Sequence, residues 1–204
     1  MKPKYAILLD GGFVTKVLGK KLKKFPTADD IVAECDRIAA LPVLSDHDLL
    51  RIYFYDAPPA TGVLTNPIDQ QRLNLANTPI HAQHSSLLDT LELRSNFALR
   101  LGETLVRSWR LGNSAFKDMV KTPRQPTAHD FVPDIEQKGV DLRIGLDIAR
   151  LSLKEMVDII VIATGDSDLV PAFKFARREG VRIYLDHLGL NVRRELKAHA
   201  DIVL

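Results

Sequence analysis

Short apolar runs alternate along the chain with segments in which apolar residues recur at helical spacing. Four apolar runs predict buried strands: residues 5–9, 50–55, 157–163 and 181–185. Four segments with helical spacing predict helices: residues 27–41, 140–153, 169–179 and 191–199. Residues 200–204 predict a last short strand. Strands that alternate with helices predict an α/β fold with a mainly parallel central sheet, and we expect residues 1–204 to form a single domain.

The pattern changes in the middle of the chain. Residues 97–111 predict an added hairpin with Gly102 and Glu103 at its turn. Its strands would project three arginines beside Trp109. Residues 112–136 contain three prolines and many polar residues, so they predict a flexible loop.

Composition changes this picture little, whereas the distribution of charge changes it more. The 204 residues include 28 basic and 26 acidic side chains, for a net charge of +2 that by itself predicts no partner. Basic residues gather at 16–24, 94–124 and 174–197. Each cluster alone is typical of a solvated helix face, but three clusters around a set of acids favour a site that cuts a polyanion.

The single cysteine, Cys35, excludes a disulfide framework and a cysteine zinc cage, and we expect it to be a packing residue. His81 and His84 lack a further ligand nearby and are expected on the surface. The absence of a long apolar run and the few apolar residues near the N-terminus favour a cytoplasmic protein without a membrane segment.

Acidic residues follow two of the predicted strands directly. Asp10 ends the first run, and Asp166 and Asp168 follow the run at 157–163. Because ligands bind at the carboxyl ends of parallel strands, these side chains are expected to meet. Asp141 lies in the first turn of the helix at 140–153, on a narrow face of small residues, and we expect it to be the contributor from this helix.

Asp147 on the same helix has Arg143 and Arg150 at the spacing of an exposed ion-pair ladder, so we predict a structural role for it. Asp56 also ends a strand, but the following Pro58 and Pro59 favour turn chemistry.

Each acid has a simpler explanation when it is taken alone. Asp168 can cap a helix, and Asp141 can complement a helix dipole. Four converging carboxylates, however, repel one another unless a cation neutralises them, and hard oxygen ligands suit Mg²⁺ or Mn²⁺. We therefore expect Asp10, Asp141, Asp166 and Asp168 to form a metal site that hydrolyses phosphodiester bonds.

Three motifs in order, at residues 8–12, 138–141 and 164–171, resemble the NYN domain family, also called LabA-like or DUF88. The resemblance implies a three-layer, PIN-like Rossmannoid fold and a metal-dependent ribonuclease whose acids carry over to the same four aspartates. It also places a frequent family acid at Asp147, in conflict with the structural role predicted above. Many members have an asparagine shortly after the first Asp-Gly, where this chain has Gly12 and Phe13.

For a ribonuclease, the partner is RNA, with single strands favoured, and Phe13 or Trp109 would stack a base. Six basic residues are expected to contact its backbone: Arg100, Arg107, Arg110, Lys138, Arg177 and Arg193. Two alternatives stay open. One is a non-catalytic RNA-binding module, and the other is a HAD-like phosphohydrolase. A HAD-like enzyme needs a second acid two residues after the nucleophilic aspartate, and Gly12 at that position argues against it.

Overall fold

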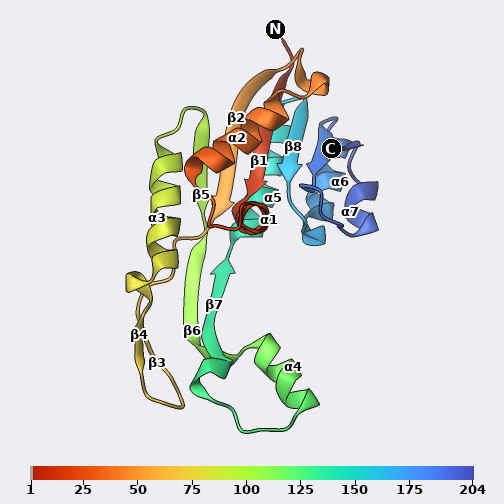
Figure 1. The fold of residues 1–204 in the computed structure, drawn as a ribbon. Coiled ribbons are helices and arrows are strands. Elements are labelled where there is room, and N and C mark those ends of the chain that lie inside the picture. Colours follow the sequence, from red (N-terminus) through yellow and green to blue (C-terminus); the bar gives the residue numbers. More distant parts are fainter. Residues whose placement is uncertain (1) are drawn as a thin grey trace.

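The computed structural model describes residues 2–204, and a six-stranded parallel sheet forms its centre (Figure 1). Its strands, in spatial order, are β10 (Ile202–Val203), β9 (Arg182–Asp186), β8 (Ile159–Ala163), β1 (Lys4–Asp10), β2 (Asp48–Asp56) and β5 (Phe97–Leu101). Every neighbouring pair runs parallel. The expected α/β class with a parallel sheet is therefore confirmed.

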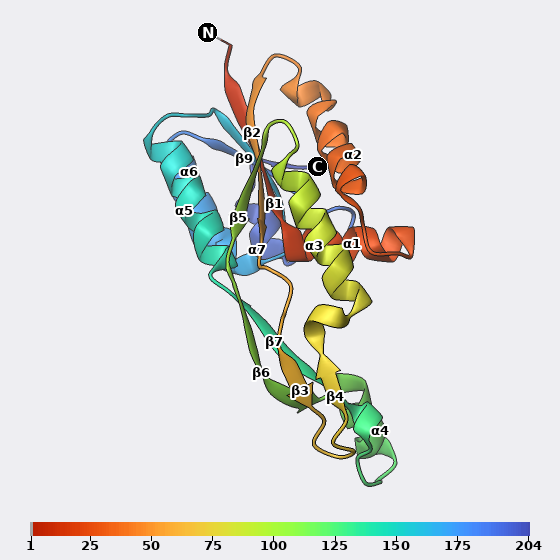
Figure 2. The ribbon, with the colours of Figure 1, turned by 90° about the vertical axis from the view of Figure 1, so that its left-hand side faces the viewer.

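Helices cover both faces of this sheet, which gives three layers (Figure 2). One face carries α1 (Gly11–Leu22), α2 (Ala28–Ala39) and α3 (Pro79–Glu92). The other carries α5 (Val140–Leu153), α6 (Val170–Arg178) and α7 (Arg194–Ala198). Single 3-10 turns lie at η1 (Pro42–Leu44), η2 (Leu75–Asn77), η3 (Ala128–Asp130) and η4 (Ser167–Leu169). None of the helices in residues 2–204 combines the length and apolar character that crossing a bilayer requires.

The position of β1 in the middle of the sheet explains why its sequence is a continuous apolar run and not an alternating one. Ile7 and Leu9 pack under α1 and α2, whereas Ala6 and Leu8 pack under α5 and α6, and all four are buried completely. A parallel strand covered on both faces needs apolar residues at every position.

Three predicted helix features are also found. Helix α2 begins after Thr27 with a capping box to Asp30, and α5 has the bounds expected from its pattern. Cys35 is buried in α2 as a packing residue.

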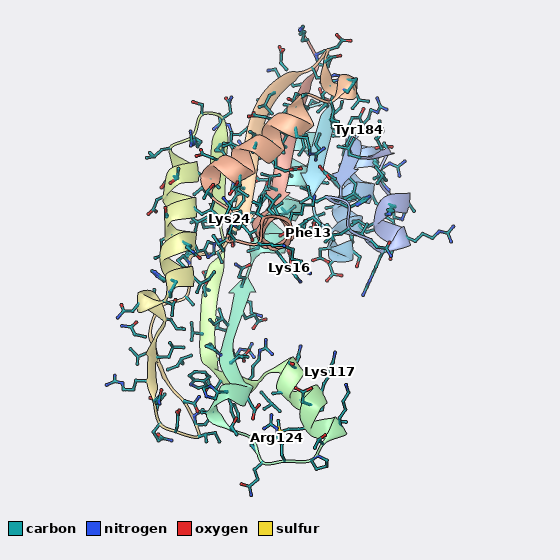
Figure 3. All side chains as sticks on the ribbon, in the orientation of Figure 1. Phe13, Lys16, Lys24, Lys117, Arg124 and Tyr184 are labelled. Carbon is teal, nitrogen blue, oxygen red and sulfur yellow. The ribbon has the colours of Figure 1, made fainter. Side chains whose placement is uncertain are left out.

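A long arm, defined here as residues 103–138, leaves the sheet at its carboxyl edge (Figure 1). It consists of β6 (Glu103–Leu111), α4 (Asn113–Lys121), η3 and β7 (Phe131–Lys138), with β6 and β7 antiparallel. The short hairpin of β3 (Val63–Thr65) and β4 (Arg72–Asn74) runs beside it, tied by Asn66 Nδ2, which donates to the Ala128 carbonyl at 3.1 Å. Lys117 and Arg124 lie at the outer end of the arm (Figure 3).

The prediction of a hairpin at residues 97–111 is wrong in its pairing. Residues 97–101 join the central sheet beside β2, and the chain continues in the same direction into β6, whose partner is β7. Gly102 is needed for close approach instead of a turn, because a Cβ there would lie 2.3 Å from the Lys138 carbonyl oxygen.

The flexible loop predicted for residues 112–136 is wrong as well. That segment contains α4, η3 and most of β7. Pro133 misled the prediction, since it lies opposite Trp109 where the register of the β6–β7 pair is interrupted and a missing N–H is tolerated.

Candidate active site

Asp10 lies where β1 ends and α1 begins, and its carboxylate is held from two sides. Its Oδ1 accepts a hydrogen bond from the Phe13 backbone N–H at 3.1 Å, as a helix cap, and its Oδ2 accepts one from the Thr164 hydroxyl at 2.9 Å. Burial raises the pKa of Asp10 to about 6, with smaller contributions from the negative charges of Asp141 and Asp166. The side chain is therefore fixed in position and is easily protonated.

The loop after β8 brings two further acids to this edge. The Thr164 hydroxyl accepts a hydrogen bond from the Asp166 N–H at 3.1 Å, and Asp166 Oδ1 accepts one from the Asp168 N–H at 2.9 Å. Gly165 leaves room for the Phe13 ring, since a Cβ at Gly165 would lie 2.7 Å from that ring. The loop is thus tied to Asp10 through Thr164 and packed on α1 through Phe13.

Asp141 in the first turn of α5 completes the group of acids. Its pKa is raised by desolvation and then by the charges of Asp166 and Asp168. The four predicted aspartates therefore come from β1, α5 and the loop after β8 and interact electrostatically at one edge of the sheet. We refer to them as the acidic edge: Asp10, Asp141, Asp166 and Asp168.

The donor chemistry of the acidic edge suits a hard divalent cation, but the spacing limits how one is held. Within residues 2–204, no three histidine, cysteine, aspartate or glutamate side chains are placed to ligate one ion. Mg²⁺ commonly keeps several waters and takes only one or two carboxylates directly, together with substrate phosphates. The residues present fit an ion of this hydrated kind.

A groove of about 530 Å³ runs from the acidic edge along α1. It is lined by Asp10, Gly12, Phe13, Asp166 and, further along, by Lys16 and Lys20. Figure 3 shows Phe13 and Lys16 on α1 near the root of the arm. A groove that is acidic at one end and basic along its wall can hold a metal-bound phosphate and the adjacent polyanion backbone.

Lys16 and Lys20 belong to the basic cluster at residues 16–24, and the count of charges alone does not mark them as groove residues. They follow Gly12 at intervals of four residues, which places all three on one face of α1. That spacing, counted from the end of the first strand, is the signal that identifies them as groove residues.

The six basic residues predicted to contact RNA are not gathered at the groove. Arg193 comes nearest, because its guanidinium donates to the Ser167 hydroxyl at 3.2 Å, in the loop that carries Asp166. The other five pair with acidic side chains. Arg107 and Lys138 contact Glu136, Arg110 contacts Asp134, Arg177 contacts Asp201, and Arg100 contacts Asp147.

The predicted ladder of Asp147 with Arg143 and Arg150 is not formed. Asp147 Oδ2 instead accepts hydrogen bonds from the buried Tyr55 hydroxyl and from Arg100 Nε, each at 3.0 Å. The residue joins α5 to the sheet on the face opposite α1, which supports a structural role through different partners.

Asp56 and His84 differ from their predictions. The Asp56 carboxylate is 2% exposed and lies against His84 Nε2 at 2.9 Å, with His84 itself 16% exposed. Asp56 is therefore a buried, paired carboxylate and not only a turn residue, and His84 is not the surface histidine that the sequence predicted. Asp56 is the last residue of β2, just as Asp10 is the last residue of β1. This shared position at the end of a strand is the sequence feature that could have indicated its buried environment.

Comparison with known proteins agrees with this fold. A crystal structure of a protein of unknown function from Vibrio parahaemolyticus is similar at 15% identity, with a TM-score of 0.55, over 100% of this chain and 92% of that one. No curated protein matches the chain. The family model for the NYN domain matches residues 73–202, which is more than half of the chain. The chain therefore belongs to the NYN domain family, a branch of the PIN-like superfamily.

Proposed function

We propose that this protein is a ribonuclease that uses Mg²⁺ or Mn²⁺ to hydrolyse RNA phosphodiester bonds at the acidic edge. The observation that carries the proposal is the convergence of four carboxylates from three separate segments at one edge of the sheet, where burial and, to a smaller extent, the neighbouring negative charges raise the pKa of both Asp10 and Asp141. Membership in the NYN domain family supports a nuclease over other uses of such a cluster.

The chain's own residues divide the work by position. Asp10, Asp141, Asp166 and Asp168 would hold the cation, directly or through water. When bound, the cation supplies stabilisation of charge on the phosphoryl group and lowers the pKa of water. Asp10 faces the groove and, when deprotonated, accepts a hydrogen bond from the attacking water and orients it.

The basic wall of the groove positions the substrate. Lys16, Lys20 and Arg193 neutralise backbone phosphates on either side of the reacting one, and Phe13 offers a ring beside them. Because the acids alone would repel RNA, these cations are what allows a polyanion to approach the acidic edge.

The function is tested by incubating the protein with a panel of single- and double-stranded RNAs in Mg²⁺, in Mn²⁺ and in EDTA. We expect cleavage that requires the metal. Salt-sensitive RNA binding without cleavage in any metal would favour the non-catalytic module, and turnover of a small phosphate ester without RNA cleavage would favour the phosphohydrolase.

A further inference from the structure

A second, smaller pocket is lined by residues of α3, of the loop after β2 and of β6 and β7 at the root of the arm. Its volume is about 190 Å³, below the range of about 300–1,000 Å³ typical of sites for drug-sized ligands. The pocket therefore has room for one small ring system and not for a whole nucleotide. We refer to it as the side pocket.

Two polar groups of the side pocket are held rigidly by one buried carboxylate. Asp56 Oδ1 accepts hydrogen bonds from Gln137 Nε2 and from the Ala57 N–H, each at 2.7 Å, and Asp56 Oδ2 faces His84 Nε2 at 2.9 Å. An ionised carboxylate only accepts, so the amide nitrogen of Gln137 must face it. The amide oxygen of Gln137 is consequently turned away as a fixed acceptor.

That amide oxygen connects the side pocket to the acidic edge. It lies 3.6 Å from the position that a Cβ on Gly12 would occupy, and Asp10 Oδ1 lies 3.7 Å from the same position. Gln137 thus contributes to the wall of the side pocket and also lies next to the residue that follows Asp10 and Gly11. Gln137 is therefore the residue that the side pocket shares with the surroundings of Asp10.

The lining suits a nucleobase. The rings of Pro58 and Pro59 and the side chains of Ile80 and Ile135 provide apolar walls, and the His81 imidazole adds an aromatic surface. Bases stack on histidine as they do on other aromatic side chains, and their edges hydrogen-bond to amides and hydroxyls. The hydroxyls of Thr78 and Thr104 also line the side pocket. Because they donate to the backbone carbonyls of Leu75 and Pro58, they can serve a base only as acceptors.

Other ligands fit this lining less well. No lysine or arginine lines the side pocket, and His84 is already paired with the buried Asp56 carboxylate, so the lining offers no permanent positive charge to hold a phosphate group. A metal ion is also disfavoured, because no three suitable side chains in residues 2–204 are placed to bind one.

We propose that the side pocket binds one unstacked nucleobase of an RNA strand whose backbone crosses the acidic edge. The identity of the strand as RNA rests on the proposed function. A base enters the side pocket only after leaving a duplex stack, so the proposal selects single-stranded RNA over double-stranded RNA.

The test measures binding of short, labelled single-stranded RNAs to the Asp166→Asn protein in EDTA, where cleavage does not interfere. Each RNA carries one abasic residue, and the abasic position is moved along the strand. We expect one position to weaken binding about tenfold, in line with the loss of one stacked base. His81→Ala should weaken binding of the intact RNA similarly and should abolish the abasic penalty at that position.

Gln83→Ala is the matched control, because Gln83 lies on the same helix but lines a different groove with Phe25 and Leu87. It should keep the full abasic penalty. The proposal is overturned if no position carries a penalty, if His81→Ala leaves the penalty unchanged, or if RNA does not bind.

The two proposals fail in distinguishable ways. A position-specific base penalty that depends on His81, in a protein that cleaves no RNA in any metal, would refute the ribonuclease and keep the side pocket. Metal-dependent cleavage by the unmodified protein without any base penalty would refute the side pocket and keep the ribonuclease.

Discussion

At the scale of single residues, Asp10 is costly to ionise in the folded protein, although its proposed role requires the ionised form. Its folded-state pKa of about 6 lies above the value of about 3.9 for an exposed aspartate. The folded protein therefore binds more protons than the unfolded chain between these values, and stability falls as pH rises through this window. The aspartate is least favourable for folding when it is ionised, which is the state that hydrolysis requires.

This cost predicts that Asp10→Asn stabilises the metal-free protein at pH 7.5. Asparagine keeps an oxygen for the Phe13 N–H but carries no charge, and the pKa shift corresponds to about 3 kcal/mol. Urea unfolding at pH 4 and pH 7.5 in EDTA measures this stabilisation. The difference in unfolding free energy between the variant and the unmodified protein should grow with pH. A difference that is independent of pH would contradict the assignment.

Asp147 is predicted to act on stability instead of hydrolysis. Asp147→Asn removes the charge that pairs with Arg100 and weakens the hydrogen bond from the Tyr55 hydroxyl, which should cost about 1.5 kcal/mol of unfolding free energy. Cleavage at saturating RNA and 20 °C should stay within about twofold, since the residue takes no part in the acidic edge. Loss of cleavage in a protein that remains folded would place Asp147 in the site and contradict this reading.

At the scale of elements, the root of the arm depends on Gly102. A side chain there would overlap the Lys138 carbonyl oxygen, and backbone cannot move aside as a side chain can. Gly102→Ala should therefore destabilise the protein by about 2 kcal/mol or more. Gly145→Ala is the matched control, because nothing lies within 4 Å of its Cβ position in α5 and alanine favours the helix by about 1 kcal/mol. Thermal unfolding of both variants compares them, and equal effects would refute the close-approach role.

The elements also show what the sequence could reveal. Strands β1, β2, β8 and β9 were predictable because burial on both faces demands continuous apolar runs, and α5 because one stripe of it packs on the sheet. The partner of β6 was not predictable, since antiparallel pairing across α4 depends on tertiary contacts. The sequence does not distinguish a glycine required by a close approach of two backbones from a glycine in a turn, and Gly102 was therefore predicted to form a turn.

The candidate site was predictable in part for the same reasons. The strand-end rule identifies Asp10, Asp166 and Asp168 from local sequence alone. The partners of Asp56 and Asp147 come from α3 and β5, far along the chain, so spacing within one helix could not identify them. Charge counts likewise failed to separate Lys16 and Lys20, which line the groove, from arginines already neutralised by acids.

At the scale of the whole molecule, the small net charge of +2 conceals an acidic edge next to a basic groove wall. Neutralising the wall with the double substitution Lys16→Gln and Lys20→Gln should weaken RNA binding at every sequence. It should also reduce the slope of log affinity against log salt by about 1.4, the value for two phosphate contacts to a single strand. Lys2→Gln with Lys154→Gln, far from the groove, is the control. Equal slopes in all three proteins would contradict a role for the wall.

The central claim is that the acidic edge hydrolyses RNA. The most direct measurement is the rate of single-stranded RNA cleavage in Mn²⁺ or Mg²⁺ by the unmodified protein, Asp166→Asn and Asp158→Asn, all purified identically. Asp158 is the control, since it lies at the opposite end of β8, where it accepts a hydrogen bond from the Lys4 N–H. We predict cleavage that EDTA abolishes, a rate for Asp158→Asn within about twofold, and a loss of at least about 100-fold in Asp166→Asn. Cleavage by Asp166→Asn as fast as by the unmodified protein, or none by any of them, would contradict the account.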